Sequence, residues 1–257
     1  MDSNYYKKLA VSMDKYSGEQ RQHLVSGYVY DTFDDEAITK MPAVFFAELL
    51  KREKDSISKW YEIQALGKLR ASEYSKLLIS VLSEPDVKFE SGTSLHLIAA
   101  KSLGLMGEVV IPKIAALWDG ASLQTRLAIL DTLGEIHSNA AADLIESLLP
   151  SLNKNEFAYA TLALTKCGVY GQQILKKCFS SYSQSEQMFC IIDALCYSSD
   201  NDEFIKGILS TNVDLISEVL VAHTRGSDLL FDRINNFVGV WDEMDKTLLQ
   251  EKGVDFN

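Results

Sequence analysis

The chain has 257 residues, 47% of them hydrophobic and 24% charged, and a formal net charge of −11. The negative charge disfavours binding to duplex DNA, which requires a cationic surface for the phosphates. Because the four prolines, the absence of a Gly/Ser-rich linker and the absence of a low-complexity tract mark no boundary, we expect one continuous domain over residues 1–257.

Residues 1–58 are predicted to form an N-terminal helical cap. Met1–Lys15 contains five charged residues and no sustained apolar core, so it does not look like a secretory signal and we expect a cytoplasmic protein. The segment PAVFFAELLKREKD predicts an amphipathic helix. The preceding acidic residues, Asp34, Asp35 and Glu36, are interpreted as helix-capping acids rather than ligands.

The segment LIAAKSLGLMGEVVIPKIAALW, residues 97–118, is apolar enough to suggest a membrane span. It nevertheless contains three charges, two glycines and a proline: Lys101, Gly104, Gly107, Glu108, Pro112 and Lys113. Each glycine weakens a helix interior by about 1 kcal/mol, and proline is tolerated only in the first turn. We therefore predict two helices, the first ended by Gly104 or Gly107. The residues expected to face inward are Leu95, Ile98, Ala99, Leu103, Ile111, Ile114 and Leu117.

The same unit of two apolar helices recurs along the chain, and self-similarity at a fixed period is typical of solenoids. Clear copies span residues 60–82 and 123–149, and fainter copies span 160–179, 190–209 and 215–234. We expect the first helix of each copy to end at a glycine or its equivalent. The positions aligned in this way are Gly67, Gly104, Gly134, Gly168, Cys196 and Gly226, with spacings of 37, 30, 34, 28 and 30 residues.

These units resemble HEAT repeats, particularly the short HEAT-like kind first noted in phycobilisome lyases. The motif is an Ala-x-x-Leu-Gly helix end followed by a turn and a second apolar helix, matched here by residues 99–104 and Val110-Ile111-Pro112. The resemblance covers residues 59–238 and leaves 239–257 as a C-terminal cap. It implies an all-α fold, an α-solenoid (α-α superhelix) of about six HEAT-like helical pairs with helical caps. Such repeats serve protein binding, enzyme scaffolding and, in one branch, DNA-repair glycosylases.

Local motifs for chemistry are missing. The cysteines, Cys167, Cys178, Cys190 and Cys196, lack C-x-x-C spacing and are predicted to pack in the core. The histidines, His23, His96, His137 and His223, are scattered singly. The segment Asp200–Glu203 is interpreted as a helix N-cap, because Ile205 stands where a calcium loop requires glycine. We therefore expect no catalytic residues, no metal and no cofactor.

The last quarter of the chain is strongly acidic, with twelve Asp or Glu and five Lys or Arg in residues 200–257. The segment DLLFDRINNFV predicts a helix with Asp228, Asp232 and Asn235 on one face, and Asp242, Glu243 and Asp245 follow. Two interpretations stay open. The acidic surface keeps the protein soluble, or it binds a basic protein partner through complementary charge.

The function expected from the sequence is a non-catalytic protein-binding scaffold. An immunity protein that neutralises a basic toxin is one concrete form, and a generic adaptor or assembly factor is the alternative. A HEAT-like DNA-repair glycosylase is disfavoured by the charge. The expected partner is a protein with a basic surface rather than nucleic acid, a membrane or a small-molecule substrate.

Overall fold

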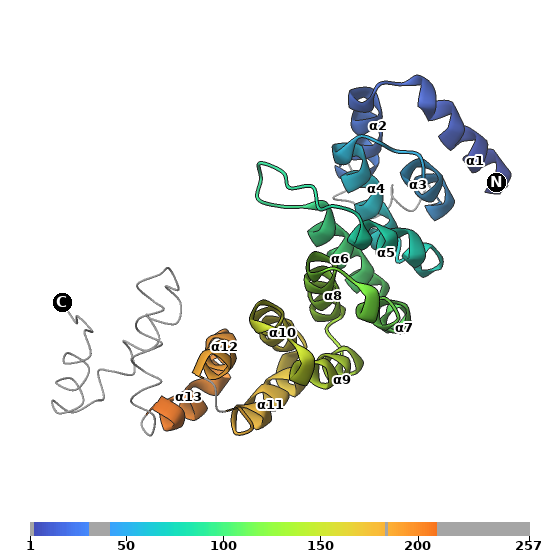
Figure 1. Cartoon of the computed structure of the whole chain (residues 1–257). Coiled ribbons are helices and arrows are strands. Elements are labelled where there is room, and N and C mark those ends of the chain that lie inside the picture. Colours follow the sequence, from blue (N-terminus) through green and yellow to red (C-terminus); the bar gives the residue numbers. More distant parts are fainter. Residues whose placement is uncertain (1–2, 31–41, 183–184, 210–257) are drawn as a thin grey trace, which may run out of the picture. The chain divides into compact units, whose positions relative to one another are not determined.

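The computed structural model describes residues 3–30, 42–182 and 185–209, and these residues are built from helices and their connections (Figure 1). Within them the only β-type pairing is an isolated antiparallel bridge between Lys88 and Ser94. The predicted all-α class is confirmed. The α-helices of this part of the chain are α1 (Ser3–Ser12), α2 (Gly18–Tyr30), α3 (Ala43–Leu50), α4 (Ser56–Lys68), α5 (Ser75–Ser83), α6 (Leu95–Met106), α7 (Ile111–Ala115), α8 (Leu123–Ile136), α9 (Asn139–Leu148), α10 (Lys154–Lys166), α11 (Gly168–Phe179), α12 (Ser185–Leu195) and α13 (Asp202–Leu209).

The chain divides into two compact units, residues 1–150 and 151–257. In the first unit, α2, α4, α6 and α8 pack against one another in that order, while α5 packs on α6 and α9 on α8 (Figure 1). In the second unit, α10 packs against both α11 and α12. Contacts between successive helical pairs are the arrangement by which solenoids bury their apolar faces. Of the predicted copies, the one at residues 215–234 lies outside the described residues.

Short polar side chains set the start of several helices. In each case an oxygen of the residue before the helix accepts a hydrogen bond from a backbone N–H in the first turn, which would otherwise lack a partner. The residues that act in this way are Asp55 before α4, Ser94 before α6, Ser122 before α8, Ser138 before α9 and Asn153 before α10. At the other end of α8, His137 adopts the left-handed conformation.

The apolar segment at residues 97–118 forms two helices, as predicted. Gly107 ends α6 with a φ of +77°, and Pro112 lies in the first turn of α7. The axes of α6 and the segment Glu108–Ala115 differ by 113°, and no single described helix is long and apolar enough to cross a membrane. Because α4, α5 and α8 all cover α6, its Ala100 and Ser102 are buried together with the predicted inward-facing residues Leu95, Ile98, Ala99 and Leu103.

The repeated glycines have a different role from the predicted one. Gly67, Gly104 and Gly134 do not end their helices but lie inside the last turns of α4, α6 and α8. A Cβ atom on Gly67 would lie 2.5 Å from the Cβ of Ser102, and one on Gly104 would lie 2.6 Å from the carbonyl oxygen of Glu135. At both of these positions glycine therefore allows the backbones of successive first helices to approach closely.

In the second unit, the predicted glycine at position 168 has another role. Gly168 is the first residue of α11, where its φ of +72° joins α10 to α11. The residue in close contact is Gly171, whose added Cβ would overlap the carbonyl oxygen of Leu164. The first helix of this copy therefore ends just before Gly168, as predicted, but Gly168 is not equivalent to Gly67 and Gly104, because it forms a turn instead of a close contact.

Candidate functional site

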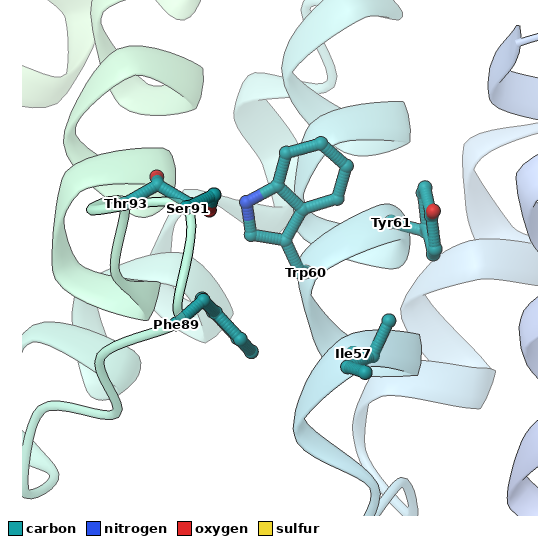
Figure 2. A pocket seen from close by; sticks show the side chains of 6 residues that line it. All are labelled: Ile57, Trp60, Tyr61, Phe89, Ser91 and Thr93. Carbon is teal, nitrogen blue, oxygen red and sulfur yellow. The ribbon is translucent and has the colours of Figure 1, made fainter.

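A pocket opens between α4 and the loop that connects α5 to α6 (Figure 2). Its volume is about 230 Å³, and it is lined by Ile57, Trp60 and Tyr61 of α4 and by Phe89, Ser91 and Thr93 of the loop. We call these six residues the aromatic pocket. Figure 2 shows Phe89 and Ile57 on opposite sides of the opening, with the nitrogen-bearing edge of Trp60 facing Ser91 and Thr93.

The helix α4 fixes one wall of the aromatic pocket. Asp55 caps its N-terminus by accepting a hydrogen bond from the backbone N–H of Ser58 at 2.8 Å, so the pocket residues lie in the first two turns of an ordered helix. The rings of Trp60 and Tyr61 meet edge to face, with centroids 4.9 Å apart. Ile57 stays 40% exposed at the rim.

The loop of residues 84–94 forms the other wall. It turns back on itself, because the backbone N–H of Phe89 donates to the carbonyl oxygen of Thr93 at 2.9 Å and that of Leu95 donates to Val87 at 3.0 Å. Gly92 closes the turn with a φ of +79°, a conformation that side chains rarely adopt. This backbone pairing brings the side chains of Phe89, Ser91 and Thr93 to the same opening (Figure 2).

Three contacts fasten the base of this loop to the helices. The imidazole Nε2 of the buried His96 lies 2.8 Å from the carbonyl oxygen of Glu84, and the Asp86 carboxylate accepts from the backbone N–H of His96 at 3.0 Å. The Lys59 ammonium lies 3.2 Å from the Glu84 carboxylate. The loop is therefore held against α6 and α4 at its first residues.

The side of α4 that faces α2 is polar. The Ser58 hydroxyl donates to the carbonyl oxygen of Gly18 at 3.3 Å. The Arg21 guanidinium of α2 donates to both oxygens of the buried Glu53 carboxylate, at 2.7 and 2.8 Å. Burial alone would raise the pKa of Glu53, but the hydrogen bonds from Arg21 and from the backbone N–H groups of Asp55 and Lys54 hold it below its usual value. Glu53 is therefore ionised in the folded protein.

Glu62 lies one turn after Ser58 on the same side of α4 and is fully buried. Neither of its carboxyl oxygens accepts a hydrogen bond from another described residue. Burial, with a further contribution from the negative charge of Glu53, raises the pKa of Glu62 to about 9. Glu62 is therefore protonated near neutral pH, since a charge without hydrogen bonds is costly to bury.

The site residues predicted from the acidic quarter of the chain lie outside the described residues. They are Asp228, Asp232, Asn235, Asp242, Glu243 and Asp245. The acidic residues Asp34, Asp35 and Glu36 lie outside the described residues as well.

The four cysteines differ in burial, so the predicted core position holds for two of them. Cys167 and Cys196 are buried, while Cys178 and Cys190 are half-buried, and all four are thiols. Within residues 3–30, 42–182 and 185–209, no three His, Cys, Asp or Glu side chains lie close enough to hold a metal ion.

The aromatic pocket was missed by the sequence analysis. Trp60 and Tyr61 belong to the predicted copy at residues 60–82, and the sequence led to no prediction for residues 84–94. The sequence held one signal, the adjacent aromatic residues Trp60 and Tyr61. Adjacent residues of a helix point about 100° apart, so two large aromatic side chains at adjacent positions do not both face the same neighbouring helix. Comparison of the chain with protein-family models, with curated proteins and with solved structures found no match.

Proposed function

We propose that this chain is a non-catalytic HEAT-like scaffold that binds a protein partner, with the aromatic pocket as one docking point. The observation that carries the proposal is an open pocket with three aromatic rings on a framework of packed helices. Pockets for cofactors and drug-sized ligands have volumes of about 300–1,000 Å³. A pocket of about 230 Å³ suits a single side chain of a partner, and tryptophan and tyrosine are enriched where such side chains contribute most to binding.

The charge of the chain favours a basic partner. Residues 200–257 carry twelve acids and five bases, and the loop of residues 84–94 carries Glu84, Asp86 and Glu90 against Lys88. Complementary charge steers association and excludes wrong partners. We propose that the acidic residues of the last quarter, Asp228, Asp232, Asp242, Glu243 and Asp245 together with Asn235, form a second contact with this partner.

An immunity protein that neutralises a basic toxin, such as a nuclease, is the concrete form of this proposal. A toxin active on nucleic acid carries a cationic surface for the phosphates, and an acidic scaffold could cover that surface. An adaptor or assembly factor for a basic protein fits the same residues. The HEAT-like glycosylase is the weaker alternative, since the net charge of −11 opposes duplex binding.

The test begins with capture of the tagged chain from its native cell, identification of bound proteins by mass spectrometry, and reconstitution of the purified pair. We expect a basic protein that binds stoichiometrically and more weakly as salt is raised. Neutralising Asp228, Asp232, Asp242, Glu243 and Asp245 to Asn or Gln should leave helicity unchanged and slow association at low salt.

A matched control removes the same charge elsewhere. It neutralises five exposed acids of the first unit, which are Glu19, Glu73, Glu108, Asp119 and Asp143. Equal association rates for the two variants would remove the acidic quarter from the proposal. Release of alkylated bases from DNA by the purified chain, without any bound protein, would replace the scaffold by the glycosylase.

A further inference from the structure

The rings of the aromatic pocket present a surface that attracts cations. Trp60 and Tyr61 come from α4 and Phe89 comes from the loop, so rings from two elements line one opening (Figure 2). The face of an aromatic ring is electrically negative, and it binds ammonium and guanidinium groups within about 6 Å of its centroid. The chain itself contains a contact of this kind between a cation and a ring, in which the Arg126 guanidinium lies 5.2 Å from the centre of the Trp118 ring.

Oxygen acceptors lie beside these rings. The hydroxyl-bearing residues Ser91 and Thr93 line the pocket from the loop, as Phe89 does. The exposed Glu90 stands in sequence between two lining residues, Phe89 and Ser91. Lys59 of α4 has its ammonium in the ion pair with Glu84. The loop as a whole carries three carboxylates and one ammonium, so its charge is complementary to a cation.

We propose that the aromatic pocket binds the guanidinium of an arginine side chain of the protein partner. Guanidinium is planar and weakly hydrated and stacks on aromatic rings, whereas the compact ammonium of lysine holds its water more strongly. The ring faces of Trp60 and Phe89 would hold the guanidinium plane, and the hydroxyl oxygens of Ser91 and Thr93 would accept its N–H groups. This inference rests on the proposed function, because it names the side chain by which a basic partner is recognised.

The test uses small peptides of known chemistry and the full-length ¹⁵N-labelled chain. The peptide acetyl-Gly-Arg-Gly-amide is titrated while the indole N–H resonances are followed by NMR, and the Trp60 resonance is assigned by its loss in Trp60→Phe. The citrulline peptide is the matched control, since citrulline has the shape of arginine without the charge. We expect the Trp60 resonance to shift with arginine, and citrulline to bind at least about tenfold more weakly, as expected for loss of a cation contact.

Variants test whether arginine binding depends on the aromatic rings or only on the shape of the pocket. Phe89→Leu keeps an apolar side chain and removes a ring, and we expect it to weaken arginine binding. Glu90→Gln removes the charge of an exposed side chain, and it should weaken arginine binding without affecting citrulline binding. Tyr159→Leu, which changes an exposed tyrosine of α10 in the second unit, should leave both titrations unchanged.

The outcomes distinguish this inference from the proposed function. Equal binding of arginine and citrulline, or tighter binding of acetyl-Gly-Leu-Gly-amide, would overturn the arginine site while the protein-binding scaffold stands. Arginine binding that Phe89→Leu and Glu90→Gln leave intact would overturn it as well. A selective arginine response in a chain that binds no protein would keep the site and overturn the scaffold.

Discussion

The two sides of α4 contact the neighbouring helices in different ways. Toward α6 the contact is close, because Gly67 brings the α4 backbone next to the buried Ser102. Toward α2 the contact is polar, with the Ser58 hydrogen bond, the buried carboxyl of Glu62 and, just before α4 begins, the Arg21–Glu53 ion pair. One helix therefore contacts the next repeat through shape and contacts the N-terminal helices through charge and hydrogen bonds.

The two contacts of α4 therefore differ in how they contribute to the free energy of unfolding. Close packing of backbones gains dispersion and apolar burial, and it tolerates no added atom. A buried polar contact contributes little net free energy when satisfied and costs a great deal when one partner is missing. On the side of α4 toward α6, the free energy of unfolding should therefore depend on added side-chain volume. On the side toward α2, it should depend on pH and on the loss of hydrogen-bonding groups.

The largest effect is expected from Gly104→Ala, at the close contact between α6 and α8. Alanine normally strengthens a helix by about 1 kcal/mol relative to glycine. Here its Cβ would lie 2.6 Å from the Glu135 carbonyl oxygen, so α6 and α8 must separate. We expect a loss of at least about 3 kcal/mol in the free energy of unfolding, measured by urea denaturation with circular dichroism.

Gly207→Ala is the matched control, because a Cβ at this position in α13 would meet no atom of the described residues within 4 Å. It should gain roughly 0.5–1 kcal/mol from helix propensity alone. If Gly104→Ala were as stable as Gly207→Ala, the glycines would not mark close contacts between successive helices.

A smaller effect is expected from Glu62, and its sign depends on pH. The pKa of Glu62 is about 9 in the folded protein, against the ordinary glutamate value of 4.5 in the unfolded chain. Between these pH values the unfolded chain loses the proton and the folded chain keeps it. Stability should therefore fall by up to about 1.4 kcal/mol per pH unit as pH rises from 4.5 to 9, which amounts to roughly 3 kcal/mol at pH 7.

Glu62→Gln removes this titration while keeping the size of the side chain. The difference in free energy of unfolding between wild type and Glu62→Gln should change steadily from pH 5 to pH 8, in favour of the variant at high pH. Glu108→Gln, at an exposed position, should track the wild type. A difference that is constant over this range would mean that the carboxyl of Glu62 is ionised and satisfied.

The smallest effect is expected from Ser58→Ala, which removes one hydrogen bond from the polar side. The bond to Gly18 is long at 3.3 Å and neutral, so its loss should cost about 1 kcal/mol. The measurement is the same urea midpoint, at a pH where Glu62 is protonated. A loss as large as that of Gly104→Ala would show that the α2 contact carries as much stability as the α6 contact.

The helical fold was largely predictable because each helix carries its own signals. Apolar spacing, the capping residues Asp55, Ser94, Ser122, Ser138 and Asn153, and the break at Gly107 and Pro112 are all local features. The role of Gly67 and Gly104 was not predictable in this way. A glycine that ends a helix and a glycine that admits a neighbouring helix look alike until the neighbour is known.

The candidate site was less predictable because it joins two separate segments. Trp60 is apolar and helical, and nothing near it in sequence indicates Phe89, which lies in a polar stretch. The state of Glu62 depends on burial by other helices. The acidic quarter, Asp228, Asp232, Asn235, Asp242, Glu243 and Asp245, was singled out by charge alone and lies outside the described residues, so its role stays a prediction.

The loop of residues 84–94 lines the aromatic pocket but is not part of the packed helices. Its tip is closed by the bridge between Lys88 and Ser94, and its base is fastened by His96, so we expect the helices on either side not to depend on what the tip contains. The entropy of closing a loop grows slowly, by about 0.6 kcal/mol for each doubling of length. Related chains could therefore exchange or lengthen the tip and acquire new partners while α4, α5 and α6 stay as they are, in the way antibodies diversify their hypervariable segments on a constant frame.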